Sequence, residues 1–269
     1  MRRAVFIALA CFMCSCRYQS VQEDGMIDKK RKEVSVSVDS LINLTSVQRM
    51  KEIEILYDPG FGSKKSYEGV RLNDVLTSLL RHYKFSADKT DVIFMCKDGY
   101  APVRYAPELL QPASGYIVYK DLEAANGRNW PDSVYDRYHP FYLVWNVDSI
   151  KAGDLPWPYG LVQIRLVEKD SLLLNILSKK KANLKGYHLF RKHCFSCHAI
   201  NHVGGQVGPE MNVPKNITEY WTDDNISHYI KEPKSFRYNA RMPAMKHIND
   251  EDIRQIIAYL HFMKKYKAP

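Results

Sequence analysis

The spacing of hydrophobic and polar positions changes twice along the chain. The chain begins with an apolar run from Ala4 to Met13, and the residues that follow, through 46, are mostly polar. Within this polar stretch, valine alternates with serine from Val34 to Val38, but the sequence shows no hydrophobic core that these valines could join. Between residues 47 and 170, short apolar runs of strand length dominate. From residue 171 onward, apolar residues recur at helical spacing between long loops. The pattern predicts a leader, a flexible linker over 17–46, a strand-rich region and a helical region.

The strand-rich region, residues 47–170, is predicted to be an α+β domain. A helix is expected from about residue 71 to 83, because apolar side chains recur there at three- and four-residue intervals: Leu72, Val75, Leu76, Leu79, Leu80 and Tyr83. Strands are expected at the apolar runs 91–95, 116–119, 141–145 and 161–167. Strands with one interior helix are typical of the α+β class.

The helical region, residues 171–269, is predicted to be all-α. One helix is expected over 183–193, and Thr222 can cap a second helix that Pro233 ends. Asn249 can cap the last helix, whose apolar stripe consists of Ile253, Ile256, Ile257 and Leu260. The chain is therefore expected to contain two domains of different class.

Residues 1–16 have the features of a signal peptide. Arg2 and Arg3 precede an apolar run that is too short to span a bilayer. The run ends near Ser15, a small residue, and Cys16 follows, as in a bacterial lipoprotein signal. Cys16 is therefore the candidate lipid anchor; the alternative is an ordinary secretory signal with incidental cysteines. Both interpretations predict export, and the first predicts a membrane tether.

Cysteine use and charge narrow the class of protein. Of the six cysteines, three lie in the leader, two belong to one motif and Cys96 stands alone, so a disulfide framework is not expected. The formal net charge is +9. Such an excess suits docking on acidic redox partners, although solvation alone also accounts for it.

The motif from Cys194 to His198, Cys-Phe-Ser-Cys-His, has the spacing that covalent haem attachment requires. Two thiols on one turn reach the two vinyl groups of a haem, and the adjacent imidazole of His198 falls below the iron. A zinc site would need two further ligands nearby, and a thioredoxin-like pair would need a preceding strand. The sequence contains neither, so Cys194, Cys197 and His198 are expected to bind one haem c.

The second axial ligand is sought in the loop before the last helix. Met242 is preferred there because a thioether raises the reduction potential, which suits an electron carrier, and because Pro243 stiffens the loop. Met245 is the nearest rival. Histidine ligands are also open, at His202, His228 and His247. Nucleic acid is not an expected partner, because export and a haem both argue against it.

Residues 185–262 resemble a class I cytochrome c domain. Gly186 and Phe190 match the glycine and aromatic residue of the family's first helix, and Tyr259 matches the aromatic residue of its last helix. Gly208 and Pro209 match the loop whose proline carbonyl accepts the N–H of the proximal imidazole. The resemblance implies one-electron transfer between ferric and ferrous iron, with Pro209 orienting His198.

Residues 51–168 resemble the molybdopterin-binding domain of the sulfite oxidase family. The resemblance rests on residues 67–76, which read Tyr-Glu-Gly-Val-Arg-Leu-Asn-Asp-Val-Leu, and on the Asp-Gly-Tyr turn at 98–100. Two departures affect the cofactor: Tyr142 stands where the family has arginine, and residues 51–66 lack the family's cysteine. Cys96 lies elsewhere and is expected to be a buried thiol. We therefore expect a fold relative that has lost molybdenum.

Together these features predict an exported c-type cytochrome, tethered in the periplasm, that carries single electrons in a respiratory chain. Its partners would be a quinol-linked donor and a terminal reductase or oxidase. Enzymatic activity is not expected. The alternatives are a molybdoenzyme of the sulfite dehydrogenase type with a fused haem, and a haem-based sensor in which a weak methionine ligand yields to a gas.

Overall fold

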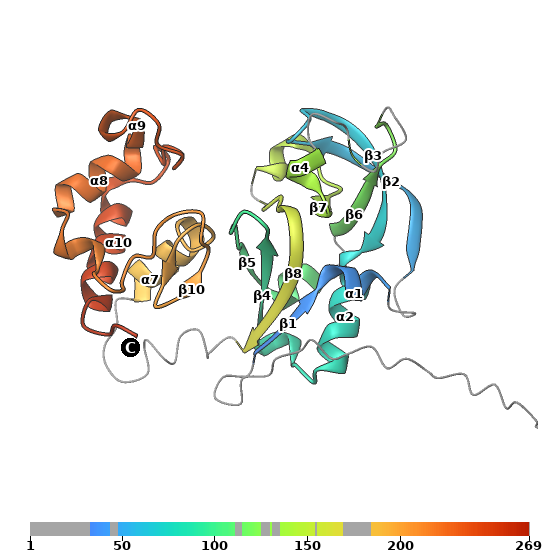
Figure 1. The fold of residues 1–269 in the computed structure, drawn as a ribbon, viewed down its shortest axis with the longest axis horizontal. Helices are drawn as coiled ribbons and strands as arrows, with labels where there is room; N and C mark the ends of the chain where they lie inside the picture. Colours follow the sequence, from blue (N-terminus) through green and yellow to red (C-terminus); the bar gives the residue numbers. More distant parts are fainter. Residues whose placement is uncertain are drawn as a thin grey trace, which may run out of the picture.

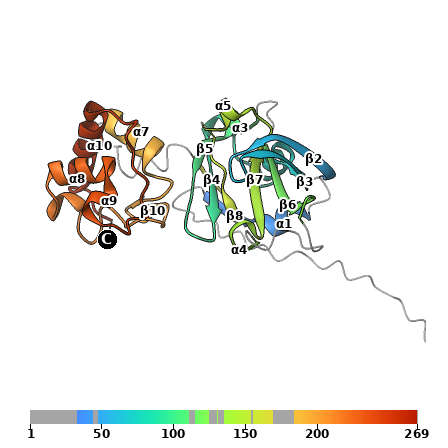
Figure 2. The same ribbon diagram turned by 90° about the horizontal axis from the view of Figure 1, so that it is seen from above.

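The structure is a computed structural model that describes residues 33–43, 48–110, 115–124, 130, 135–153, 155–168 and 184–268. The predicted signal peptide and its candidate anchor Cys16 lie outside the described residues and stay predictions. Within the described ranges, no helix is both long and apolar enough to cross a membrane. Two regions of different architecture lie side by side, with the β4–β5 hairpin on the side of the sheet nearest the helical region (Figures 1 and 2).

The first region is built on an antiparallel sheet with the order β2-β3-β6-β7-β8-β4-β5, and β1 pairs with β8 beside β7. The strands are β1 (Glu33–Ser37), β2 (Arg49–Asp58), β3 (Ser63–Arg71), β4 (Thr90–Cys96), β5 (Val103–Tyr105), β6 (Gly115–Asp121), β7 (Phe141–Trp145) and β8 (Tyr159–Glu168). The four predicted strands are confirmed as β4, β6, β7 and β8. Sequence reasoning missed β2 and β3, because charged residues occupy their exposed positions.

Helix α2 (Leu72–His82) is the helix predicted over 71–83. Its apolar stripe is buried against residues of β4, β6 and β8, which form one core. The remaining helical segments are single turns: α1 (Val38–Ile42), η1 (Ala87–Lys89), α3 (Ala106–Leu110), α4 (Tyr135–Tyr138) and α5 (Ser149–Ala152). The region is therefore an α+β domain, as the periodicity predicts.

The predicted linker over 17–46 needs correction. Residues 33–37 form β1, which pairs with β8, and residues 38–42 form α1. Val34 and Val38 are 1% and 0% exposed and belong to the main core. Their alternation with serine was visible in the sequence, but their partner strand lies far along the chain, so no core could be assigned to them.

The second region contains α7 (Leu184–His193), η3 (Ile217–Glu219), α8 (Asp223–Lys231), α9 (Pro233–Phe236) and α10 (Asp250–Met263). Thr222 and Asn249 cap α8 and α10 through their side chains, as predicted. Helices α7 and α10 pack through Tyr259, whose ring centroid lies 5.7 Å from that of Tyr187 and 5.6 Å from that of Phe190. The helices and their caps therefore follow from the sequence pattern.

The expectation of an all-α second domain is corrected by a small hairpin. Strands β9 (Ala199–Ile200) and β10 (Val203–Gly204) pair antiparallel directly after the cysteine motif. The two residues between them, Asn201 and His202, have φ values of 54° and 66°, which is the left-handed geometry of a tight hairpin turn. Asn-His is not a common sequence for such a turn, so the pattern gave no signal for it.

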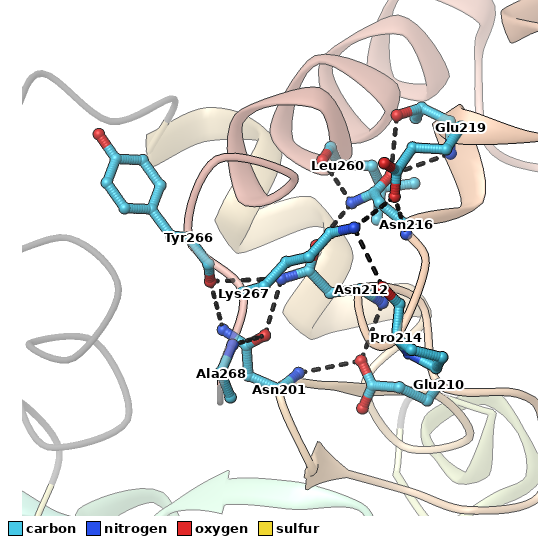
Figure 3. A network of polar contacts seen from close by, with 11 residues as sticks. Asn201, Glu210, Asn212, Pro214, Asn216, Glu219, Leu260, Tyr266, Lys267 and Ala268 are labelled. Carbon is cyan, nitrogen blue, oxygen red and sulfur yellow. Dashed lines mark hydrogen bonds and ion pairs between the residues drawn. The ribbon is translucent and has the colours of Figure 1, made fainter.

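Buried asparagines attach the loop after this hairpin to the end of α10 (Figure 3). Asn216 is 0% exposed and donates to the carbonyl of Leu260 at 2.9 Å and to the side chain of Asn212 at 2.7 Å. Asn201 donates to the carbonyl of Tyr266 at 2.7 Å. Because buried amides are costly when unpaired, this network holds the loop in one position.

Candidate functional site

A cavity of about 330 Å³ lies within the helical domain, and its lining is mostly apolar. Protein pockets for cofactors and other small ligands typically have volumes of roughly 300–1,000 Å³. The lining brings together Cys194, Cys197, His198, Met242 and Met245. The structure therefore collects at one cavity the thiols, the imidazole and both candidate methionines that the sequence singled out.

The end of α7 places the two thiols and the imidazole. The amide of Cys194 donates to the carbonyl of Phe190 at 2.8 Å, which continues the helix by one turn. The amides of Cys197 and His198 then both donate to the carbonyl of Cys194, at 3.0 and 2.9 Å. This tight turn is what the Cys-x-x-Cys-His spacing requires, because all three side chains must reach the same cavity.

The surroundings of both thiols make them less acidic than a free cysteine. Burial, and then the neighbouring Cys197, raise the pKa of Cys194 to about 12. Burial, and then the charge of Asp98, raise the pKa of Cys197. A reactive dithiol needs a lowered pKa instead. Among the described residues, no group of three or more His, Cys, Asp or Glu side chains could hold a metal ion.

The imidazole of His198 is held in one orientation. Its Nδ1 lies 2.9 Å from the carbonyl oxygen of Pro209, and because a carbonyl only accepts, Nδ1–H is the donor. Nε2 then carries a lone pair and can bind a metal. Burial lowers the pKa of His198, against the opposing effect of the Pro209 bond. The bond to Pro209 therefore fixes the orientation of the ring and leaves Nε2 as the nitrogen that could bind a metal.

Gly208 leaves room for this ring. A Cβ at that position would collide with the ring, at 2.6 Å from Nδ1. Gly205 has a similar role, because a Cβ there would collide with the backbone of Ser196. Glycine is thus needed at both positions for the loop to pack against the cysteine motif.

The two methionines come from the loop between α9 and α10. Met242 and Met245 are both half-buried and both line the cavity. The amide of Met245 donates to the carbonyl of Ile230 at 2.9 Å, which ties that part of the loop to α8. His202, His228 and His247 are not among the residues that line the cavity. The structure therefore favours a methionine over these histidines.

Sequence reasoning missed part of the lining. Arg237 and Arg241 line the cavity and are exposed, so positive charge stands at its rim. Trp221 lines it as well, and its ring stacks on that of Phe236 at 5.8 Å. His193 also lines it. The only feature of the sequence that could have indicated a role for the two arginines is their position in the same loop as Met242.

Among the described residues of the sheet domain, those at the positions singled out for molybdenum make other contacts. Tyr142, at the position where the sulfite oxidase family has arginine, is 1% exposed and its hydroxyl donates to Asp58 at 3.1 Å. Tyr67 donates to the same carboxylate at 2.8 Å. Cys96 is 6% exposed, and burial, followed by the charge of Asp98, raises the pKa of its thiol. A buried thiol of high pKa is a poor metal ligand, so these residues do not fit a molybdenum site.

Comparison with known proteins concerns the helical domain. Residues 181–260 match the family described as cytochrome C oxidase, cbb3-type, subunit III. A curated relative is cytochrome c oxidase subunit 2 of Alkalihalophilus pseudofirmus (strain ATCC BAA-2126 / JCM 17055 / OF4), which is 31% identical over 87 residues. That match covers 30% of this chain and 25% of the relative, so the chain spans about a quarter of the relative's length. No solved structure matches the chain.

The cavity and these matches point to one class: residues 181–260 are similar to a cytochrome c domain, a class that implies covalently bound haem and electron transfer. Within that class, the match is to the type found in subunit III of cbb3-type oxidases. The resemblance of the sheet domain to the sulfite oxidase family stays a prediction.

Proposed function

We propose that the protein is an exported electron carrier with one haem c, bound through thioether bonds to Cys194 and Cys197. His198 is the proximal ligand and Met242 the distal ligand. The observation that carries the proposal is the bond between His198 Nδ1 and the Pro209 carbonyl, beside a cavity lined by both thiols and both methionines. The haem, when bound, supplies one-electron redox chemistry between ferric and ferrous iron.

The protein's own residues orient and insulate the site. Pro209 fixes the tautomer of His198 and strengthens its donor nitrogen. The apolar lining, which includes Phe190, Ile226 and Leu260, excludes water and so favours the less charged ferrous state. Arg237 and Arg241 stand where they can pair with two carboxylates, which suits the haem propionates.

Two features favour Met242 over Met245 as the distal ligand. Pro243 follows Met242 and restricts the backbone, so the thioether has fewer conformations to lose on binding. Met245 is instead attached to α8 through its amide, which donates to the carbonyl of Ile230. Two filled axial positions would leave no open site for a substrate.

The partners follow from charge and from the relatives. The net charge of +9 suits acidic redox proteins, and the matched relatives are subunits of terminal oxidases. We propose a quinol-linked donor on one side and a terminal oxidase or reductase on the other. The signal-like leader supports a periplasmic protein held at a membrane by a lipid on Cys16.

The test is expression of the full chain with haem-attachment machinery, followed by absorption spectroscopy and haem quantification. We expect one haem per chain, loss of covalent haem in the variant Cys194→Ala/Cys197→Ala, and normal haem in the matched control Cys96→Ala. Met242→Ala should lose the ferric band of the sulfur–iron bond, whereas Met245→Ala should keep it. A protein without covalent haem would refute the proposal, and loss of the band only in Met245→Ala would reassign the ligand.

A further inference from the structure

The turn between β4 and β5 contacts the haem-attachment motif directly. The amide of Ala101 donates to the carbonyl of Ser196, between the two cysteines, at 2.8 Å. The carbonyl of Gly99 accepts from the amide of Gln206 at 2.8 Å. A side-chain hydrogen bond also links Tyr100 to Ser196. These contacts join the sheet domain to the two loops that surround the proximal side of the cavity.

A buried ion pair holds the other end of the same hairpin. Arg191 on α7 lies one turn before Cys194 and donates to Asp91 on β4 at 2.7 Å. The Asp91 side chain is 0% exposed and that of Arg191 is 18% exposed. Although burial alone would lower the pKa of Arg191, the Asp91 carboxylate more than offsets this and raises it. Such a pair is costly to separate, because each charge would need a new partner or water.

Apolar packing fills the space between these two points. Ile93, Ala101 and Val103 of the sheet domain are buried in the same cluster as Phe190 and Phe195 of the helical domain. The two domains therefore share a continuous core at this interface rather than touching only through polar groups. Two hydrogen bonds between backbones, an ion pair and a shared core are the features of a fixed interface.

Gly99 is adapted to this contact in two ways. Its φ is +90°, and a Cβ would lie 3.0 Å from the carbonyl carbon and 3.1 Å from the Cβ of Gln206. Gly62, in the turn between β2 and β3, also has a positive φ, of +68°, but a Cβ there would meet nothing within 4 Å. Gly99 contacts the helical domain and Gly62 does not, although both have a positive φ. Alanine substitutions at the two positions therefore separate the effect of the interface from the effect of backbone strain.

We infer that the sheet domain is a permanent cover for the haem-attachment loop, and that this cover shields the Cys197 side of the haem from water and from partner proteins. The cover ends at Gln206, since the next residue, Val207, is 48% exposed and lines the cavity. Tyr220, on the same cavity, is 53% exposed. Electron exchange is thereby directed to the rim formed by these two residues. This inference rests on the proposed haem site.

The test uses the full-length holoprotein and two variants of the interface, Arg191→Met and Gly99→Ala. Each has a matched control: Lys192→Met removes the same charge from the next, exposed position of α7, and Gly62→Ala introduces the same strain in a distant turn. Solution scattering reports whether the domains stay together. The midpoint potential and the rate of haem reduction by ascorbate report exposure of the haem.

We expect both interface variants to become more extended and to show a lower midpoint potential, because water at the haem edge favours the ferric state. Ascorbate should nevertheless reduce them severalfold faster than the wild type, because it gains access to the uncovered haem edge. Both controls should behave as the wild type. If the domains separate but the midpoint potential and the reduction rate do not change, the sheet domain does not shield the haem. If the variants stay compact and their potential and rate do not change, these contacts do not hold the two domains together. Absence of haem from the wild type would refute the proposed function instead, and scattering would still test the interface.

Discussion

Gly208 offers the sharpest test of the proximal side of the site. In Gly208→Ala, the new Cβ would lie 2.6 Å from Nδ1 of His198, whereas ordinary contacts begin at 3.4 Å. The nearest ring atom, Cε1, would lie only 2.3 Å from this Cβ, so the ring or the loop must move by roughly 1.1 Å. The hydrogen bond to Pro209 is 2.9 Å long, and a displacement of that size away from the carbonyl takes it beyond useful hydrogen-bond length.

We expect two consequences of this displacement. Overpacking costs about 1–3 kcal/mol of stability, which denaturant unfolding measures. The proximal imidazole also loses its fixed orientation, so the iron should bind carbon monoxide faster in the ferrous state and show a partly high-spin ferric spectrum. Gly153→Ala is the control, because a Cβ at Gly153 meets nothing within 4 Å.

A Gly208→Ala protein that retains the wild-type spectrum, carbon monoxide kinetics and stability would refute this expectation. That result would mean that the loop from residue 203 to 209 yields without moving the imidazole. The loop is held by the amide of Gly208, which donates to the carbonyl of Cys197 at 2.8 Å, so free movement is not expected.

Three further predictions follow from other parts of the chain. Asn216→Ala should lower the free energy of unfolding by about 2 kcal/mol in denaturant titration, because it removes the amide that donates to the carbonyl of Leu260 and to the buried side chain of Asn212. Metal analysis of the purified protein should give iron without molybdenum, and the protein should not oxidise sulfite; one molybdenum per chain would contradict our interpretation of Tyr142 and Cys96. In the wild-type ferrous protein, carbon monoxide should bind slowly, whereas fast binding would favour a gas sensor.

The sequence predicts the longer helices and the strands β4, β6, β7 and β8 because their signals are local. The stripe of α2 and the caps of α8 and α10 depend on neighbouring residues, and the structure reproduces them closely. The same holds for the Cys-x-x-Cys-His turn, where the spacing itself sets the geometry. Local periodicity and capping are therefore sufficient for these parts.

The missed features depend on partners far apart in the sequence. Val34 is recognisable as core only once β8 is known to lie beside it. Arg191 carries no local signal of an ion pair, because its carboxylate partner lies on a strand 100 residues away. Arg237 and Arg241 acquire meaning only when the cavity is seen. No pattern within a short window carries such information, because it arises from the tertiary fold.

The interface also explains why the two domains should affect each other chemically. Arg191 and Cys194 lie on successive turns of the same helical segment, and the amide of Cys194 is bonded to the carbonyl of Phe190 beside Arg191. A shift of β4 relative to α7 would therefore be transmitted through one helical turn to the residues that hold the haem. If the cover is fixed as we infer, any ligand or protein that binds the sheet domain and strains this hairpin should change the midpoint potential of the haem, without touching the iron or its axial ligands.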